Sequence, residues 1–186
     1  MLNLPNTITL LRFALIPAIV LQLLQFDYAS AFILFMLSAL SDFADGVIAR
    51  RWNLRTRFGA VADPLADKLT MITVTLLLAV QQVLPWWFAL AVVVRDALIV
   101  GGAIAYHVCI GHVEMAPSRI SKLNTSLEFL LLTSVLALSA GHVGDGVWLQ
   151  ALMFVTLVSI GLSGLHYVLV WGHKAVRERG SHASPG

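Results

Sequence analysis

Four aspartates lie close together in the sequence and could take part in chemistry. Asp42 and Asp45 are three positions apart, and Asp63 and Asp67 are four positions apart. On helices, each pair would project from one face, with Cβ atoms about 5–6 Å apart. The segment between the two pairs is short and rich in arginine. Two helices joined there would direct all four carboxylates toward one another.

Carboxylates held this close repel each other unless they are protonated or bound to cations. Hard divalent cations such as Mg²⁺ and Mn²⁺ prefer oxygen ligands, and four carboxylates would neutralise two of them. The alternative is that the acids are solvated and paired with nearby arginines, namely Arg50, Arg51, Arg55 and Arg57. That alternative suits one acid better than four, so the sequence favours a site for two divalent cations, Mg²⁺ or Mn²⁺.

Small residues accompany the acids at Gly46, Ala49 and Gly59. Glycine costs a helix roughly 1 kcal/mol relative to alanine, so the close approach of a backbone or a ligand would explain its presence. Tight packing between helices explains the small residues equally well when they are taken alone. Together with the cations and the arginines, they favour a phosphorylated ligand at a membrane surface, and a pyrophosphate fits best.

The elements that carry these residues are apolar. Of the 186 residues, 59% are apolar and 12% are charged, whereas a soluble domain carries roughly 25% charged residues. This composition excludes an ordinary soluble domain and a disordered chain, and a net charge of +2 leaves no basic face for nucleic acid. A spanning helix takes about 20 apolar residues. The chain has six apolar runs near that length: 7–25, 29–48, 69–83, 87–106, 127–140 and 147–171.

These runs predict an all-α integral membrane bundle of six transmembrane helices. Runs 69–83 and 127–140 are short, so we expect neighbouring residues to be helical too. Lysine and arginine mark the cytoplasmic side of a membrane protein. All lysines and arginines of this chain can be placed on one side, although the placement of Arg95 depends on its depth in a helix. Both termini are therefore expected in the cytoplasm. We expect residues 1–173 to form the membrane domain and residues 174–186 to form a disordered cytoplasmic tail.

The spacing of the acids resembles the signature of a known family. Residues 42–67 read D-x2-D-G-x2-A-R-x8-G-x3-D-x3-D, which is similar to the signature of the CDP-alcohol phosphatidyltransferases. The resemblance extends to the six-span plan and to the opening segment 3–7 with Arg12. It implies that Asp42, Asp45 and Asp63 bind two divalent metals beside Asp67, which acts as the general base. It also implies that Gly46, Ala49, Arg50 and Gly59 adjoin the cytidine nucleotide.

Family membership would make the chain a phospholipid-synthesising enzyme of a bacterial inner membrane, with its active site facing the cytoplasm. The phosphatidyl group of CDP-diacylglycerol would move to an acceptor hydroxyl, and CMP would leave. The alternative from another class is a small transporter or channel, because acids in membranes also form ion paths. The absence of an internal repeat and the clustering of the acids toward one face argue against transport. The oligomeric state is left open, with a homodimer as one alternative.

The acceptor is the harder choice. Residues 50–68 look like bacterial phosphatidylglycerophosphate synthases, which use glycerol 3-phosphate, but Ala103 and Asn124 stand where those enzymes place two cations. Residues 121–125, Ser-Lys-Leu-Asn-Thr, instead resemble the CMP-forming cardiolipin synthases. We therefore expect phosphatidylglycerol as the acceptor, with glycerol 3-phosphate as the alternative. The candidate acceptor-binding residues are Arg95, Arg119 and Lys122.

Charged residues also interrupt the apolar runs at Arg95, Asp96 and Glu128. An ion pair between adjacent helix positions has poor geometry, so we expect Arg95 and Asp96 to find partners on other helices. Their role could be to join helices or to line the acceptor pocket. The sequence favours the pocket slightly for Arg95 and leaves both roles open for Asp96 and Glu128.

Overall fold

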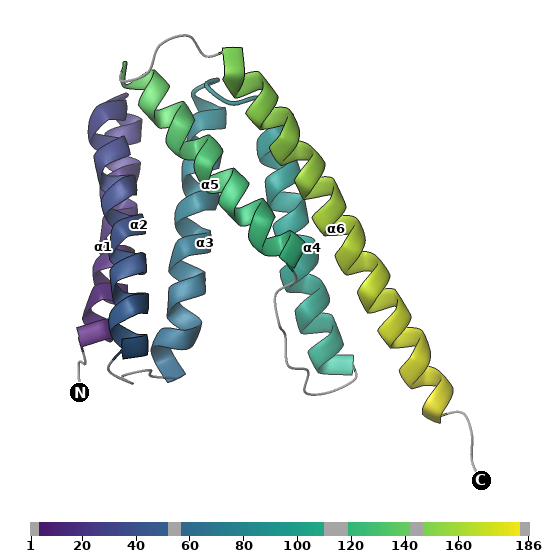
Figure 1. The fold of residues 1–186 in the computed structure, drawn as a ribbon. Coiled ribbons are helices and arrows are strands. Elements are labelled where there is room, and N and C mark those ends of the chain that lie inside the picture. Colours follow the sequence, from purple (N-terminus) through teal and green to yellow (C-terminus); the bar gives the residue numbers. More distant parts are fainter. Residues whose placement is uncertain (1–3, 52–56, 110–118, 142–146, 183–186) are drawn as a thin grey trace. The chain divides into compact units, whose positions relative to one another are not determined.

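The computed structural model describes residues 4–51, 57–109, 119–141 and 147–182, and side-chain surroundings within residues 11–44, 65–102, 120–141 and 147–167. The described residues form six helices and no strand (Figure 1). The helices are α1 (Leu4–Leu24), α2 (Tyr28–Arg51), α3 (Arg57–Val80), α4 (Trp86–Cys109), α5 (Arg119–Ser139) and α6 (Val147–His182). The all-α class with six helices is therefore confirmed.

The turns between the first helices are tight and have defined caps. After α1, Phe26 has a φ of 58°, and the Asp27 amide donates to the Gln22 carbonyl at 3.0 Å. This is the Schellman arrangement, which satisfies carbonyls at a helix end. The carboxylate of Asp27 then caps α2, because it accepts bonds from the Ser30 amide at 3.0 Å and the Ser30 hydroxyl at 2.7 Å. A short turn of this kind makes α1 and α2 antiparallel.

The chain divides into two compact units. Unit 1 consists of Met1–Trp86 and Phe129–Leu149, so it holds α1, α2, α3 and the second part of α5. Helix α1 packs against α2 and α3, and the Gln81 side chain donates to the Leu23 carbonyl of α1. The rings of Phe35 and Phe129 stack with centroids 5.3 Å apart, which joins α2 to α5. Within unit 1, the start of α1, the end of α2 and the start of α3 lie at the same end (Figure 1).

Unit 2 consists of Trp87–Glu128 and Gln150–Gly186. It therefore holds most of α4, the first part of α5 and nearly all of α6. Its buried apolar residues include Phe88, Val92 and Ile160. Several polar residues are also buried in unit 2, and they include Arg95, Asn124 and Ser163.

The distribution of polarity differs from that in a soluble protein at the surface and in the buried charges. Large apolar side chains are exposed on all six helices, for example Leu21, Phe43 and Phe154. Arg12 and Arg95, in contrast, are buried. A soluble monomer rarely exposes large apolar patches, whereas a membrane bundle turns its ionisable groups inward. Several hydroxyl groups within the helices donate to carbonyls one turn earlier, as Thr70 does to Ala66 at 2.9 Å, so these groups need no water.

The helices differ in how far their apolar stretches extend. Among the described residues, one stretch, Val147–Tyr167 of α6, is long and apolar enough to cross a membrane, and the apolar stretches Leu11–Leu24 and Tyr28–Ala44 are shorter. The short runs are extended as expected, because α3 begins at Arg57 and α5 at Arg119. In the predicted tail, α6 continues to His182, so residues 174–182 are helical rather than disordered. That segment has no proline. Its basic residues stabilise the helix, because positive charges near a helix C-terminus interact favourably with the helix dipole.

Candidate active site

The acidic cluster is built on the end of unit 1 where α1, α2 and α3 come together. The guanidinium of Arg12, from α1, donates to Asp42 of α2, with Nη1 and Oδ1 2.5 Å apart. The side chain of Arg12 is 2% exposed and that of Asp42 is 45% exposed. The carboxylate is therefore held from the buried side and is open on the other side.

Asp67 joins this group from α3. It precedes the apolar run that begins at Leu69, so it lies outside the expected membrane span. Desolvation by neighbouring groups raises the pKa of Asp67, and the negative charge of Asp42 raises it further. The positive charges of Arg12 and Lys68 act in the opposite direction on the same pKa. Asp42, Asp67 and Arg12 therefore lie close enough to influence one another electrostatically, although they come from three helices.

The other predicted acids are placed only by their helices. Asp45 lies on α2 and Asp63 on α3, which confirms that each aspartate pair is carried on one helix, but their side chains lie outside the described residues. The same holds for the predicted nucleotide-binding residues Gly46, Ala49, Arg50 and Gly59. Within the described side chains, no group of three possible metal ligands is found.

The described donors nevertheless have the chemistry that divalent cations require. Asp42 and Asp67 offer hard carboxylate oxygens, and each keeps part of its surface exposed. Mg²⁺ and Mn²⁺ select such oxygens. Desolvation is the main cause of the raised pKa of Asp67, and the negative charge of Asp42 adds to it; a bound cation would favour the charged form of both acids. The described part of the cluster thus fits a divalent metal.

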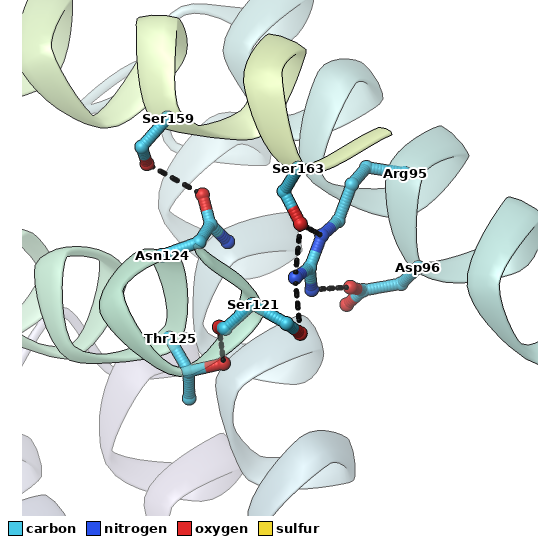
Figure 2. A network of polar contacts seen from close by, with 7 residues as sticks. All are labelled: Arg95, Asp96, Ser121, Asn124, Thr125, Ser159 and Ser163. Atoms are coloured by element: carbon cyan, nitrogen blue, oxygen red, sulfur yellow. Dashed lines mark hydrogen bonds and ion pairs between the residues drawn. The ribbon is translucent and has the colours of Figure 1, made fainter. Parts of the chain in front are cut away.

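A second polar network lies in unit 2 and centres on Arg95 of α4 (Figure 2). Its Nη1 donates to Asp96 Oδ1 at 2.8 Å. Its Nη2 donates to Ser121 Oγ of α5 at 2.8 Å and to Ser163 Oγ of α6 at 2.9 Å. The guanidinium therefore joins three helices, and both Arg95 and Asp96 have side chains only 4% exposed.

The prediction that Arg95 and Asp96 would not pair locally is wrong. The long arginine side chain bends back to its neighbour's carboxylate and also reaches hydroxyls on α5 and α6. Spacing arguments for helix pairs concern side chains that point outward. Burial changes the balance, because an unpaired charge costs several kcal/mol in a low-dielectric interior. The expectation of partners on other helices is correct for Arg95.

Asn124 extends the network along α5. Its side chain is fully buried, and its Oδ1 accepts a bond from Ser159 Oγ of α6 at 2.7 Å (Figure 2). Its Nδ2 has no hydrogen-bond partner within the described part of the chain. One turn earlier, the Ser121 carbonyl accepts from Thr125 at 3.1 Å. The network thus combines one ion pair with neutral amide and hydroxyl groups.

The remaining acceptor-binding candidates are less defined. Lys122 is exposed on α5, and the side chain of Arg119 lies outside the described residues. Glu128 is buried, with 1% exposure. Of the three predicted cations, the structure therefore brings only Arg95 into a defined polar network.

The sequence analysis missed three residues of these sites. Arg12 was noted as part of a resemblance, but its contact with Asp42 was not foreseen. Ser159 and Ser163 were not noted at all, although they are four positions apart on α6 and therefore share one face. The available signal for Arg12 was an arginine within an apolar run. The available signal for Ser159 and Ser163 was their helical spacing.

Exposed apolar side chains, buried arginines and an acidic cluster at one end of three helices are features of a membrane-embedded enzyme. Residues 2–171 match the CDP-alcohol phosphatidyltransferase family, and the chain belongs to that family.

Individual relatives carry two different names. A Mycobacterium tuberculosis protein named "Putative cardiolipin synthase" is 42% identical over 103 residues, which cover 54% of this chain and 48% of the relative. The human "Cardiolipin synthase (CMP-forming)" is 27% identical over 94% of this chain and 63% of the relative. A Sodalis glossinidius protein named "CDP-diacylglycerol--glycerol-3-phosphate 3-phosphatidyltransferase" is 36% identical over 73% of this chain and 77% of the relative. The match thus spans about half the length of the mycobacterial relative.

Proposed function

We propose that this protein transfers the phosphatidyl group of CDP-diacylglycerol to an acceptor alcohol and releases CMP. The observation that carries the proposal is the convergence of Asp42, Asp67 and Arg12 from three helices in a chain with the family signature. A bond forms between the acceptor oxygen and the phosphatidyl phosphorus, and the bond from that phosphorus to the CMP oxygen breaks. The proton of the acceptor hydroxyl must be taken up during this exchange.

Asp67 is the residue that we assign to that proton. Its exposed carboxylate oxygen accepts the proton, and the desolvation that raises its pKa makes it a stronger base than an ordinary aspartate. Asp42, Asp45 and Asp63, with Asp67 beside them, would hold two Mg²⁺ or Mn²⁺ ions, and Gly46, Ala49, Arg50 and Gly59 would adjoin the nucleotide. When bound, such ions supply electrostatic stabilisation of charge on the pyrophosphate.

The proposal includes a location in the membrane. Exposed apolar side chains on all six helices and buried arginines support six transmembrane helices. Both termini and the acidic end of unit 1 would face the cytoplasm, in a bacterial inner membrane, because lysine and arginine concentrate on that side.

For the acceptor, the network of unit 2 supports phosphatidylglycerol, which would give cardiolipin. The charge of Arg95 is already balanced by Asp96, and Asn124 is neutral. Glycerol 3-phosphate is a soluble dianion and needs several free cations, whereas the phosphodiester of phosphatidylglycerol carries one charge. Glycerol 3-phosphate remains the second candidate, because relatives carry both names.

The deciding experiment gives the purified protein CDP-diacylglycerol and Mg²⁺ or Mn²⁺, together with phosphatidylglycerol or glycerol 3-phosphate in separate reactions. Released CMP and the lipid formed are then measured by mass spectrometry. We expect CMP and cardiolipin from the first reaction. Phosphatidylglycerophosphate as the main product would reject the acceptor but keep the enzyme class. An absence of CMP from every acceptor would favour the transporter or channel alternative.

A further inference from the structure

Arg12 of α1 is a buried cation in contact with a candidate metal ligand, and the mechanism above gives it no role. Its guanidinium lies 2.5 Å from Asp42 Oδ1, and its side chain is 2% exposed. One cation from α1 therefore contacts an acid of α2 at the end of unit 1 where the acidic cluster lies.

We infer that Arg12 is a positioning residue that fixes the carboxylate of Asp42 for divalent metal binding. The inference rests on the proposed function, because it takes Asp42 as a metal ligand. The guanidinium holds Oδ1 from the buried side, and 45% of the Asp42 side chain stays exposed for a ligand to approach. Groups that hydrogen-bond to a metal ligand fix its orientation, and their loss weakens metal binding by about 10–100-fold.

A competing role for Arg12 is that of a cation that occupies the site and must leave before metal binds. The geometry argues against this role. Arg12 reaches Asp42 from the interior, whereas metal would arrive from the exposed side. The Arg12 side chain is 2% exposed, so its guanidinium lies within the bundle and not in the exposed space beside Asp42. It therefore acts as a fixed part of the site rather than as an exchangeable ion.

A purely structural bridge between α1 and α2 is the other competing role. Helix α1 is already secured by apolar contacts, which bury Ile19 and Leu23, and by the bond from Gln81 to the Leu23 carbonyl. Apolar residues often replace buried ion pairs with no loss of stability. A bridge alone therefore gives no reason for an arginine at this position, whereas orientation of Asp42 does.

The test measures Mn²⁺ binding to the purified full chain in nanodiscs. Electron paramagnetic resonance detects the free ion, so the loss of its signal reports the bound fraction. The variants are Arg12→Met, Arg12→Lys, Asp42→Asn and the double variant Arg12→Met with Asp42→Asn. We expect Arg12→Met to weaken Mn²⁺ binding by about 10–100-fold. The lysine variant should bind several-fold more weakly than wild type, because an ammonium lacks the planar guanidinium geometry. In the Asp42→Asn background, removal of Arg12 should have no further effect.

Gln81→Leu is the matched control, because it removes a different tether of α1 at the other end of the helix. It should leave Mn²⁺ affinity unchanged. Unchanged or tighter binding in Arg12→Met would overturn the inference, as would an equal loss in Gln81→Leu. If Arg12→Met cannot be purified folded, wild-type affinity in Arg12→Lys overturns it. Equal Mn²⁺ binding by wild type and Asp42→Asn would instead reject the proposed metal site.

Discussion

At the scale of single residues, the described part of the protein places buried positive charge at two points and uses it differently. Arg12 is paired with Asp42, whose side chain is partly exposed, at the acidic end of unit 1. Arg95 is paired with an acid that is as buried as itself, Asp96, within unit 2. An open carboxylate can take a further ligand, whereas a closed pair serves mainly to join helices. The two arginines should therefore respond differently to substitution.

The first prediction concerns the acids of unit 1. Asp67→Asn should lower CMP release from CDP-diacylglycerol by about 10²–10⁴-fold, the usual contribution of a general base, and Asp42→Asn should lower it at least about 10-fold through loss of a metal ligand. The amide keeps the size of the side chain but removes its negative charge and its basicity. Initial rates in detergent, with thermal unfolding as the test of folding, provide the measurement.

Asp27→Asn is the control for this prediction. Asp27 also belongs to unit 1 but caps the start of α2, whereas Asp42 lies near the end of that helix. Its amide variant should keep wild-type activity. Near wild-type turnover by folded Asp42→Asn or Asp67→Asn would contradict the proposed mechanism.

The second prediction concerns the closed pair of unit 2. Arg95→Met and Asp96→Leu should each destabilise the fold by about 3–5 kcal/mol, because each leaves one buried charge without its partner. The double variant should recover much of this loss. Thermal unfolding in detergent gives the coupling, and Lys122→Met, which alters an exposed charge, should change stability by no more than about 0.5 kcal/mol. Additive losses in the double variant would show that the pair is not a unit.

At the scale of elements, the turn between α1 and α2 determines how Arg12 meets Asp42. The Schellman bonds end α1, and the Asp27 carboxylate begins α2 within a few residues. The resulting antiparallel pair returns the chain to the level of Arg12 by the time it reaches Asp42. The cap is therefore part of the framework that positions the acidic cluster.

The third prediction is the pH dependence of this cap. Bonds from the Ser30 amide and hydroxyl lower the pKa of Asp27 in the folded chain. Because the folded pKa lies below the unfolded value, the stabilisation is complete above the unfolded pKa and is lost as pH falls through the folded pKa. Wild type should therefore lose thermal stability relative to Asp27→Asn as the pH is lowered through the acidic range. A difference in unfolding midpoint that is constant with pH would contradict this.

The helices were largely predictable from the sequence, but their ends and contacts were not. Apolar runs near the length that a bilayer requires located all six helices. The extension of α3 back to Arg57 was expected, but the end of α6 was missed, because the segment up to His182 is helical without being apolar. The aspartate pairs followed from helical spacing. The pairing of Arg95 with Asp96 did not, since it depends on burial that sequence spacing does not report.

At the scale of the whole molecule, the exposed apolar side chains and buried arginines of the described residues agree with the proposed membrane location and substrate. Exposed apolar side chains such as Leu37 and Leu162 would face lipid tails, while the acids lie at one end of unit 1. A substrate such as CDP-diacylglycerol has the same division, with acyl chains in the bilayer and a charged pyrophosphate at its surface. A site at the level of the head groups can thus bind it without drawing the pyrophosphate into hydrocarbon.

The last prediction is the orientation that this arrangement requires. Green fluorescent protein fused after Gly186 should fluoresce, because the C-terminus is expected in the cytoplasm, and alkaline phosphatase at the same position should be inactive. Fused between α5 and α6, the two reporters should give the opposite result, since that connection carries Asp145 and no lysine or arginine. The internal reversal acts as the control, because a misfolded fusion would fail at both positions. Active alkaline phosphatase after Gly186 would place the C-terminus outside. The proposed topology would then be rejected.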